Sequence, residues 1–153
     1  MAADLRRRVR RFRILVIGRA NAGKTTILQK VCNTTDQPEI YNAKGKKVDE
    51  TVVDPTGGRG LHDINNELVF RSNPGFIFHD SRGFESGAVT ELNDVQAFIA
   101  NRLRQKDLDQ QLHAIWYCLP LDNARPISTA EELFFTKCGT GKGIVIGLIK
   151  IEC

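Results

Sequence analysis

Short apolar runs, separated by polar stretches that contain glycine or proline, set the pattern of this chain. A run of about four to ten residues rich in β-branched and aromatic side chains has the length and composition of a buried strand. Within 62–70 apolar and polar positions alternate instead, which is typical of a strand exposed on one side. We therefore predict strands at residues 14–17, 62–70, 76–80, 114–119 and 143–152.

Apolar positions with helical spacing lie between these strands. They recur every three or four residues over 89–103 and predict an amphipathic helix of about 15 residues. An earlier helix is predicted over 23–32. A third is predicted over 128–139, where Ser128 and Glu131 have the spacing of a capping box.

The order of these elements indicates the fold class. Strands that alternate with helices predict an α/β domain whose mostly parallel sheet is covered on both faces. We expect one antiparallel strand in this sheet. Residues 33–60 are largely polar and predict a long loop, and no internal repeat or second domain is visible in the 153 residues.

The positive charge of the chain is concentrated at its start. Residues 1–13 hold six arginines and one acid and so carry +5, which leaves −1 for the rest of a chain whose total is +4. A nearly neutral body argues against a nucleic-acid-binding face across the domain. We interpret 1–13 as a solvated basic leader and 14–153 as the folded domain. Contact of the leader with anionic lipid, a phosphate backbone or an import receptor is the alternative.

The composition is typical of soluble globular proteins. No window approaches the roughly 18 consecutive apolar residues that a membrane helix needs. The four cysteines are scattered without a C-x-x-C pair, which argues against a zinc site and against a disulfide scaffold. We expect free thiols in a reducing compartment, the cytoplasm.

Residues 18–25, GRANAGKT, match the phosphate-binding pattern G-x-x-x-x-G-K-[ST] at every fixed position. They follow a predicted strand and open a predicted helix, which is the context that this pattern requires. The glycines let successive N–H groups face a phosphate, and the helix presents its positive end to the same anion. Lys24 would reach the β- and γ-phosphates, and the Thr25 hydroxyl would be a ligand of Mg²⁺. The residues expected to bind the nucleotide here are Asn21, Ala22, Gly23, Lys24, Thr25 and Thr26.

A second motif lies at the end of the predicted strand 76–80. Asp80 and Gly83 form a D-x-x-G pattern directly after apolar residues. A carboxylate at a strand end can hold Mg²⁺ through water, and a glycine N–H can donate to the γ-phosphate. The pattern is informative because it follows a phosphate-binding loop in chain order. We predict Asp80 as a metal ligand and Gly83 as a phosphate ligand.

With these two motifs the chain resembles a P-loop GTPase G domain over roughly residues 12–152. The stretches HDSRGFESG and WYCLPLDNARP are similar to those of fungal G-domain proteins in the septin-like neighbourhood. The resemblance implies a Rossmann-like, three-layer P-loop NTPase fold, GTP and GDP as ligands with Mg²⁺, and a nucleotide-dependent switch. It also implies a protein effector or dimerisation of G domains. A threonine that closes over Mg²⁺ is expected before the strand near His62, with Thr56 as the first candidate and Thr51 as the second.

Guanine selection in this family depends on an [N/T]-K-x-D motif at the end of a late strand. The matching positions here are Ile149, Lys150, Ile151 and Glu152, so the lysine is kept while the polar residue and the aspartate are replaced. Lys150 and Glu152 are the expected base-binding residues. The chain then stops at Cys153, so the last strand, the base-backing loop and the final helix expected of a G domain are missing from it. Guanine preference therefore depends more on the resemblance than on these residues.

Hydrolysis is expected to be slow. Small GTPases orient water with a glutamine after the D-x-x-G glycine, and this chain has the apolar Phe84 there. Arg19 and Arg82 are candidates for stabilising charge in the transition state, although a solvated arginine is the preferred interpretation of both. His79 is excluded as a base because in a strand it points away from Asp80. No catalytic residue is assigned.

The sequence thus predicts a GTP-binding protein with slow Mg²⁺-dependent GTP hydrolysis. Three alternatives stay open. The first is a pseudo-GTPase that serves as an interaction module. The second is a P-loop protein that binds nucleotides with little base selectivity, or an ATPase. The third is a gene-model fragment that does not fold alone. A turnover assay, competition by ATP and a cooperative melt, respectively, separate them from the main interpretation.

Overall fold

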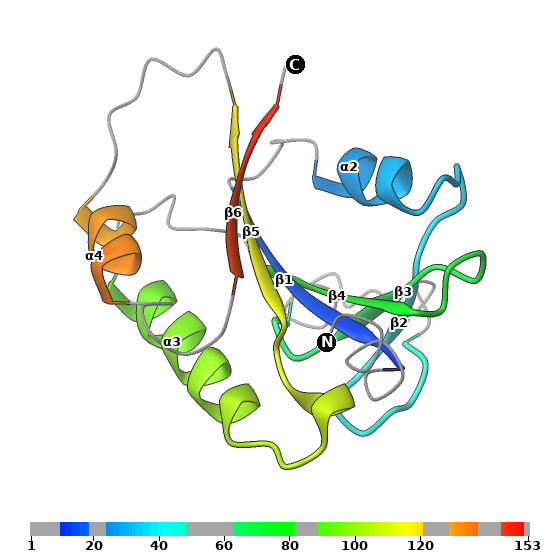
Figure 1. Cartoon of the computed structure of the whole chain (residues 1–153), viewed down its shortest axis with the longest axis horizontal. Helices are drawn as coiled ribbons and strands as arrows, with labels where there is room; N and C mark the ends of the chain where they lie inside the picture. The colour runs from blue at the N-terminus through cyan, green and yellow to red at the C-terminus, as the bar shows by residue number, and fades with distance from the viewer. Residues whose placement is uncertain are drawn as a thin grey trace, which may run out of the picture.

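The computed structural model describes residues 10–18, 24–48, 63–81, 89–120, 129–137 and 145–151 and has an α/β fold (Figure 1). Among these residues the strands form a six-stranded sheet in the order β2-β3-β4-β1-β5-β6, so β1 lies between β4 and β5. The strand bounds are β1 Phe12–Gly18, β2 Glu39–Tyr41, β3 Glu67–Val69, β4 Phe76–Ser81, β5 Ala114–Pro120 and β6 Val145–Ile151.

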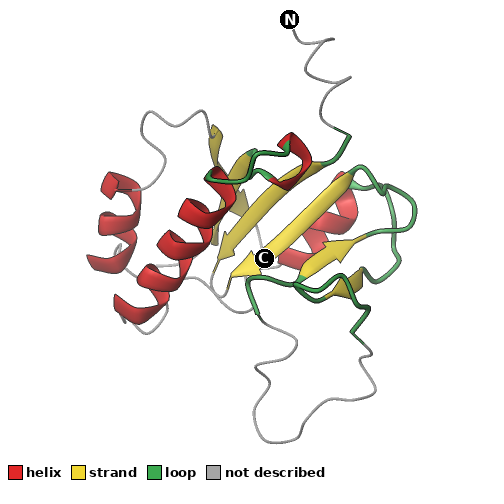
Figure 2. Cartoon of the chain, turned by 90° about the horizontal axis from the view of Figure 1, so that it is seen from below, coloured by secondary structure: helices red, strands yellow, loops and turns green. Residues whose placement is uncertain are grey.

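Helices cover both faces of this sheet. The helix α2 (Lys24–Val31) lies on one face, and α3 (Val89–Leu103) and α4 (Thr129–Lys137) lie on the other (Figure 1). Figure 2 shows the same three layers from below, with the strands between the helices. A short 3-10 helix, η1 (Leu108–Gln110), precedes β5.

The sheet is mostly parallel, as the sequence predicts. β4, β1, β5 and β6 pair in parallel, while β3 is antiparallel to both of its neighbours, β2 and β4. Ile17 near the end of β1 is in register with Ser81 of β4 and Tyr117 of β5. The carboxyl ends of the parallel strands therefore form one edge of the sheet, where open α/β sheets bind their ligands.

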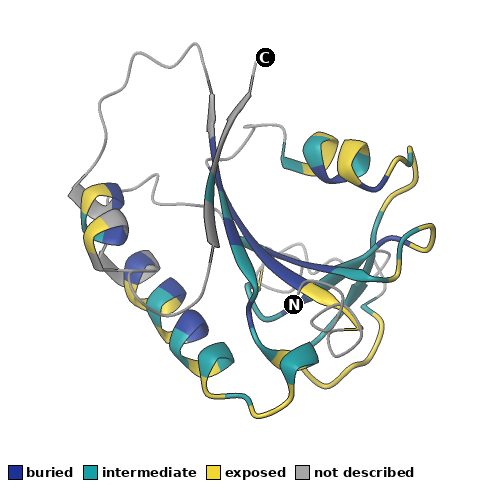
Figure 3. Cartoon of the chain, viewed as in Figure 1, coloured by how far each residue is buried: buried dark blue, intermediate teal, exposed yellow. Residues whose placement is uncertain are grey.

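Two apolar cores lie between the sheet and the helices, and β1 contributes to both. Its side chains alternate between the faces and are buried from Arg13 to Gly18. Leu15 and Ile17 belong to the core on the side of α3 and α4, and Val16 belongs to the core beneath α2. Figure 3 shows this burial in the central strands and on the helix faces turned toward them. A strand buried on both faces needs a nearly continuous apolar run.

β1 begins two residues before the predicted strand 14–17. Phe12 and Arg13 pair with the first residues of β4, so the leader predicted as 1–13 ends before Phe12. Arg13 is 1% exposed, which corrects its interpretation as a solvated arginine. The reason is its position in the strand, because Arg13 shares a face with Leu15 and points toward α3.

The other differences lie near the β2 edge of the sheet. The predicted loop 33–60 contains the strand β2, an edge strand of three residues that is too short and too mixed in polarity to form an apolar run. The predicted strand 62–70 is reduced to the three residues of β3. A turn closed by a hydrogen bond from the Asn66 N–H to the Asp63 carbonyl, 3.0 Å, precedes β3 and shortens it.

The remaining described elements agree closely with the predictions. α3 has the predicted bounds, and α2, α4, β4, β5 and β6 differ by a few residues at most. None of the helices in the described ranges is both long and apolar enough to cross a bilayer. Cys32 and Cys118 are buried free thiols, and Cys138 and Cys153 lie outside the described residues.

Candidate functional site

Four predicted site residues are described with their side chains: Lys24, Thr25, Thr26 and Asp80. Lys150 lies near the carboxyl end of β6, where it pairs with Leu119 of β5, and its backbone alone is described. The other residues considered for the site lie outside the described residues: Arg19, Asn21, Ala22, Gly23, Thr51, Thr56, Arg82, Gly83, Phe84 and Glu152.

The fold brings Lys24 and Asp80 together at the carboxyl edge of the sheet. Lys24 is the first residue of α2, which follows β1, and Asp80 is the penultimate residue of the adjacent strand β4. His79 packs against Phe98 of α3, with the ring centroids 4.8 Å apart. Alternation along the strand then directs Asp80 to the other face, which carries α2, and His79 and Asp80 point in opposite directions as the sequence predicts.

The ammonium group of Lys24 lies among three oxygen atoms. Its Nζ donates to the Gly18 carbonyl at 3.0 Å and to the Ser81 carbonyl at 2.8 Å, and it lies 2.9 Å from Oδ1 of Asp80. The Lys24 side chain is 11% exposed and that of Asp80 is 30% exposed. The ammonium therefore makes two hydrogen bonds to backbone carbonyls and one ion pair to Asp80, and the lysine joins the ends of β1 and β4.

One carboxylate oxygen of Asp80 has no hydrogen-bond donor in the part of the chain that the structure describes. Its Oδ1 is buried, and Lys24 approaches it closely enough for an ion pair but without the alignment of a hydrogen bond. A buried, incompletely satisfied carboxylate oxygen is a suitable acceptor for a metal ion or a metal-bound water.

The donors near Asp80 fit Mg²⁺ in one particular mode. Among the described residues no three His, Cys, Asp or Glu side chains gather into a metal-binding group. Mg²⁺ usually binds one or two carboxylates and completes its octahedron with phosphate oxygens and water. The carboxylate of Asp80 is a ligand of the kind that this mode uses, and the hydroxyl of Thr25, the residue after Lys24 in α2, is a second oxygen donor of that kind.

Gly18 is the point where β1 lies too close to its neighbours for a side chain. A Cβ at this position would lie 3.0 Å from the Cβ of Cys118 and 3.1 Å from Cδ of Lys24. The absent side chain leaves room for the lysine stem to cross the end of β1 toward Asp80. This close approach is a physical reason for a glycine at the first position of the GRANAGKT loop.

Gly18→Ala is therefore expected to lower the free energy of unfolding by about 1–3 kcal/mol, the usual cost of overpacking. The Cβ of Cys118 is fixed to a central strand and cannot move aside easily. Urea unfolding followed by fluorescence of the single tryptophan, Trp116, measures the loss. Gly75→Ala is the control, because its Cβ would meet nothing nearer than 3.9 Å. Equal stability of the two variants would contradict the packing argument.

Cys118 lies close to the candidate site but is chemically inert. Its side chain is buried, and this burial raises the pKa of the thiol to about 11. The charge of Lys24 lowers this pKa and that of Asp80 raises it, both by less than burial does. The thiol is therefore protonated at neutral pH, and a protonated buried thiol is a poor nucleophile. Cys118 is a packing residue beneath the site.

The helix α2 presents its first turn to the site and ends within eight residues. Asn33 takes a left-handed conformation, φ 50°, and two hydrogen bonds of the Schellman type close the helix there. Thr25 and Thr26 are exposed in the first turn. Thr26 also lines a hollow of ≈ 610 Å³ that continues along α2 to Asp36.

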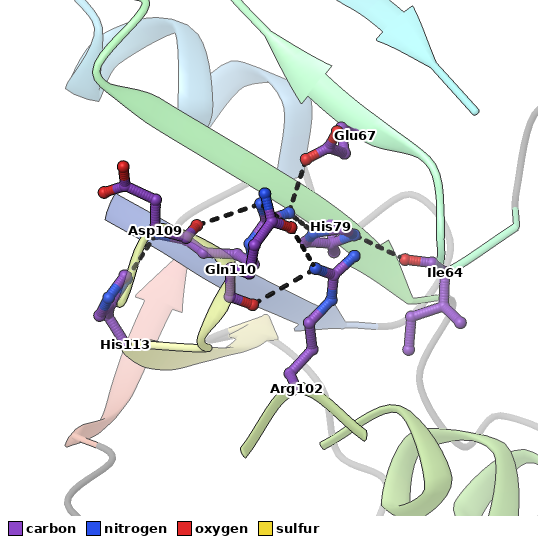
Figure 4. Close-up of polar contacts among 8 residues, drawn as sticks. Ile64, Glu67, His79, Arg102, Asp109, Gln110 and His113 are labelled. Carbon is purple, nitrogen blue, oxygen red and sulfur yellow. Dashed lines mark hydrogen bonds and ion pairs between the residues drawn. The ribbon is translucent and has the colours of Figure 1, made fainter. Parts of the chain in front are cut away.

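A buried polar group, which we call the Arg13 cluster, lies on the opposite face of the sheet (Figure 4). Nη1 of Arg13 donates to Oε2 of Glu67 at 2.6 Å and lies 2.8 Å from Nε2 of His79. Nη2 donates to the Asp109 carbonyl at 3.2 Å and to Oε1 of Gln110 at 3.4 Å. No motif in the sequence indicates this cluster, although the alternation of Arg13 with the buried residues of β1 is a signal that its side chain is buried.

The hydrogen-bond partners assign different tautomers to the two described histidines. Nδ1 of His79 lies 2.8 Å from the Ile64 carbonyl and must carry the proton, so Nε2 accepts from Arg13. In His113, Nδ1 accepts from the backbone N–H of Arg13 at 2.9 Å, so the proton is on Nε2. Burial, and secondly the charge of Arg13, lower the pKa of His79 to about 3. The ring is therefore neutral at physiological pH.

Stability is expected to fall as the pH is lowered from 6.5 to 5. In this range an unfolded histidine binds a proton, whereas His79 in the folded chain does not, so each pH unit costs about 1.4 kcal/mol and the loss at pH 5 is about 2 kcal/mol. The charged groups that act on the ring are Arg13 from β1 and Arg102 from α3, and Glu67 from β3 pairs with Arg13. Urea unfolding at several pH values measures the slope.

His79→Gln is the control for this pH dependence. Its amide is uncharged at every pH, so the contribution of residue 79 disappears while that of His113, whose pKa burial also lowers, remains. The slope of stability against pH should then be clearly smaller than in the wild type. An unchanged slope would contradict the assignment of a neutral, buried His79.

No model of a known protein family matches the chain, and no curated protein matches it. The functional interpretation therefore depends on the residues of the site and on their geometry. Lys24 and Asp80, which the structure brings into contact, belong to two motifs that the sequence assigns to one phosphate and metal site, whereas no motif indicates the Arg13 cluster.

Proposed function

We propose that this chain binds GTP and GDP with Mg²⁺ at the carboxyl edge of its sheet and hydrolyses GTP slowly. The observation that carries the proposal is the 2.9 Å contact between Lys24 and Asp80, which belong to two separate motifs. A glycine-containing loop between a central parallel strand and a helix, with an acid at the end of the next strand, is typical of P-loop NTPases. The proposal includes a G-domain form of this fold and the cytoplasm as its compartment.

The phosphate end of the nucleotide would be bound by the loop before α2. Backbone N–H groups of residues 21–26 and the positive end of the helix suit an anion. Lys24 is held by two carbonyl oxygens and is not fully buried, so its ammonium can turn from Asp80 to a phosphate and keep charge-assisted hydrogen bonds. Asp80 and Thr25 would hold Mg²⁺, which neutralises charge on the phosphates when it is bound.

The remaining roles belong to residues outside the described side chains. The N–H of Gly83 and the hydroxyl of Thr56 would contact the γ-phosphate and its metal, and Lys150 and Glu152 would contact the base. The backbone of Lys150 lies near the carboxyl end of β6, on the same edge of the sheet as Gly18. Phe84 cannot orient water, so turnover is expected to depend on electrostatics alone and to be slow.

Equilibrium binding of fluorescent GTP and GDP to the purified chain tests this proposal. With Mg²⁺ present, we expect both nucleotides to bind, unlabelled GTP to displace them and ATP to compete poorly. Asp80→Asn should weaken binding in Mg²⁺ but leave binding in EDTA unchanged, because it removes a metal ligand and not a phosphate ligand. Phosphate release under single-turnover conditions should be on the order of 10⁻⁴ to 10⁻³ s⁻¹, as for an unassisted GTPase.

Each contrary result has a distinct meaning. Equal displacement by ATP would leave a nucleotide binder without base selectivity. Binding without any phosphate release would leave a pseudo-GTPase. Failure of the folded chain to bind either nucleotide would refute the proposal.

A further inference from the structure

β4 carries Asp80 near its carboxyl end. There it pairs with β1 on one side, while its pairing with β3 on the other side lies further back, at Phe78. β1 pairs with β4 as far as Ser81. On the other side, Leu68 and Phe78 are the pair in register between β3 and β4 among the described strands. The last residues of β4 therefore extend past this pairing and lie beside the turn at 63–66.

The side chain of His79 connects this end of β4 to its surroundings. Nδ1–H donates to the Ile64 carbonyl in the turn, and Nε2 accepts from Arg13 of β1, each at 2.8 Å. The ring also packs on Phe98 of α3, with centroids 4.8 Å apart. Both ring nitrogens and one ring face therefore have partners, and the ring is fully buried. These contacts together fix the orientation of the ring.

Arg13, the partner of His79, is also held from several sides, and Figure 4 labels its partners. Its guanidinium contacts Glu67 of β3 and the Asp109 carbonyl of η1. It also donates to Gln110, whose side-chain oxygen accepts from Arg102 of α3 at 3.1 Å. The donor that orients His79 is therefore fixed by β3, η1 and α3 together.

We propose that His79 is a positioning residue that acts through the backbone on Asp80. The two residues are consecutive in β4 and lie on opposite faces, so a tilt of the strand at His79 moves the Asp80 carboxylate relative to Lys24. With the ring held at both nitrogens, the carboxylate stays 2.9 Å from the ammonium group. The consequence for Mg²⁺ rests on the proposed function, whereas the positioning itself requires no nucleotide.

A double-mutant cycle on stability tests the positioning directly. The coupling between Lys24→Met and Asp80→Asn is measured by urea unfolding in three backgrounds: wild type, His79→Leu and His79→Gln. We expect a favourable coupling in the wild type and none beyond error in His79→Leu. His79→Gln should retain it, because a glutamine amide can both donate to Ile64 and accept from Arg13. A purely structural His79 would destabilise all members of the cycle equally and leave the coupling unchanged, which would overturn the proposal.

Nucleotide binding in the same variants separates this proposal from the proposed function. If the wild type binds GTP, His79→Leu should lose most of the tightening that Mg²⁺ produces and keep its affinity in EDTA, as expected for a misplaced Asp80. If the wild type binds no nucleotide but the coupling depends on His79, the function fails and the positioning stands. Normal Mg²⁺ dependence in His79→Leu would overturn the positioning.

The tautomer of His79 in the wild-type protein gives a test that needs no variant. Long-range ¹⁵N–¹H correlation should show His79 neutral with its proton on Nδ1 and His113 with its proton on Nε2. A His79 proton on Nε2 would mean that it does not accept from Arg13, and the proposal would be wrong even if His79→Leu failed to fold.

Discussion

Lys24→Ala is expected to weaken the binding of fluorescent GTP and GDP at least a hundredfold. Lys24 is the first residue of α2, and among the described residues its ammonium group is the cation that forms an ion pair with Asp80. Two charge-assisted hydrogen bonds to phosphate, each worth about 1.5–3 kcal/mol, correspond to a factor of roughly 10² to 10⁴ in Kd. Alanine supplies neither bond, and the loop N–H groups alone remain.

The matched control for this prediction is Lys30→Ala. Lys30 lies in the last turn of the same helix, is exposed and carries the same charge. Its removal should change Kd by no more than about twofold, since it is screened by solvent and far along α2 from the first turn. Both variants are measured well below their melting temperatures, as monitored by Trp116. Similar weakening by both would indicate a general charge effect, and unchanged binding in Lys24→Ala would remove the GRANAGKT loop from the proposed site.

The elements that the sequence predicts well are those whose own apolar pattern indicates that they are buried. β1, β4 and β5 are runs of apolar side chains, and α3 places buried residues such as Leu92 and Ile99 at helical spacing. β2 is different, because its three residues, Glu39, Ile40 and Tyr41, form no apolar run and become a strand only through pairing with β3. Such an edge strand depends on tertiary context, which local propensity does not contain.

The candidate site divides in the same way. Lys24 and Asp80 are predictable because each belongs to a motif with a recognisable neighbourhood, and chain order then implies that they meet. Arg13 is one of six arginines in residues 1–13, and the local sign of its burial is its alternation with the apolar residues of β1. Its partners Glu67 and His79 lie 54 and 66 positions away, and no local pattern signals that they will converge.

Arg13→Met is expected to lower the free energy of unfolding by about 3–5 kcal/mol, the usual cost of removing one partner of a buried ion pair. Methionine retains an unbranched apolar stem, so the loss is mainly electrostatic. Glu67 would lose its counter-ion, His79 its donor, and the Asp109 carbonyl a hydrogen bond, in a place where Arg13 is 1% exposed. A domain at the lower end of the usual range, about 5 kcal/mol, would then be close to unfolding. Urea unfolding followed by Trp116 fluorescence and circular dichroism measures the change.

Arg11→Met is the control, because the residue is exposed and its recorded contact with Asp109 comes from the backbone N–H, which methionine keeps. Its stability should change by no more than about 0.5 kcal/mol, as for other exposed substitutions. Comparable losses in the two variants would indicate a general effect of removing positive charge and would contradict a special cost at Arg13. Comparable stability of Arg13→Met and wild type would exclude the buried cluster.

A triple variant, Arg13→Met with Glu67→Leu and His79→Leu, tests the origin of the cost. If Arg13→Met is unstable because it leaves Glu67 and His79 without a partner, replacing these partners by apolar side chains should restore part of the lost stability. The triple variant is therefore expected to be more stable than Arg13→Met alone, even though it lacks all three polar groups. It should still lose the coupling between Lys24 and Asp80, because leucine at 79 cannot bind the Ile64 carbonyl. A cluster that is dispensable for stability but required for that coupling would be maintained for the geometry of Asp80.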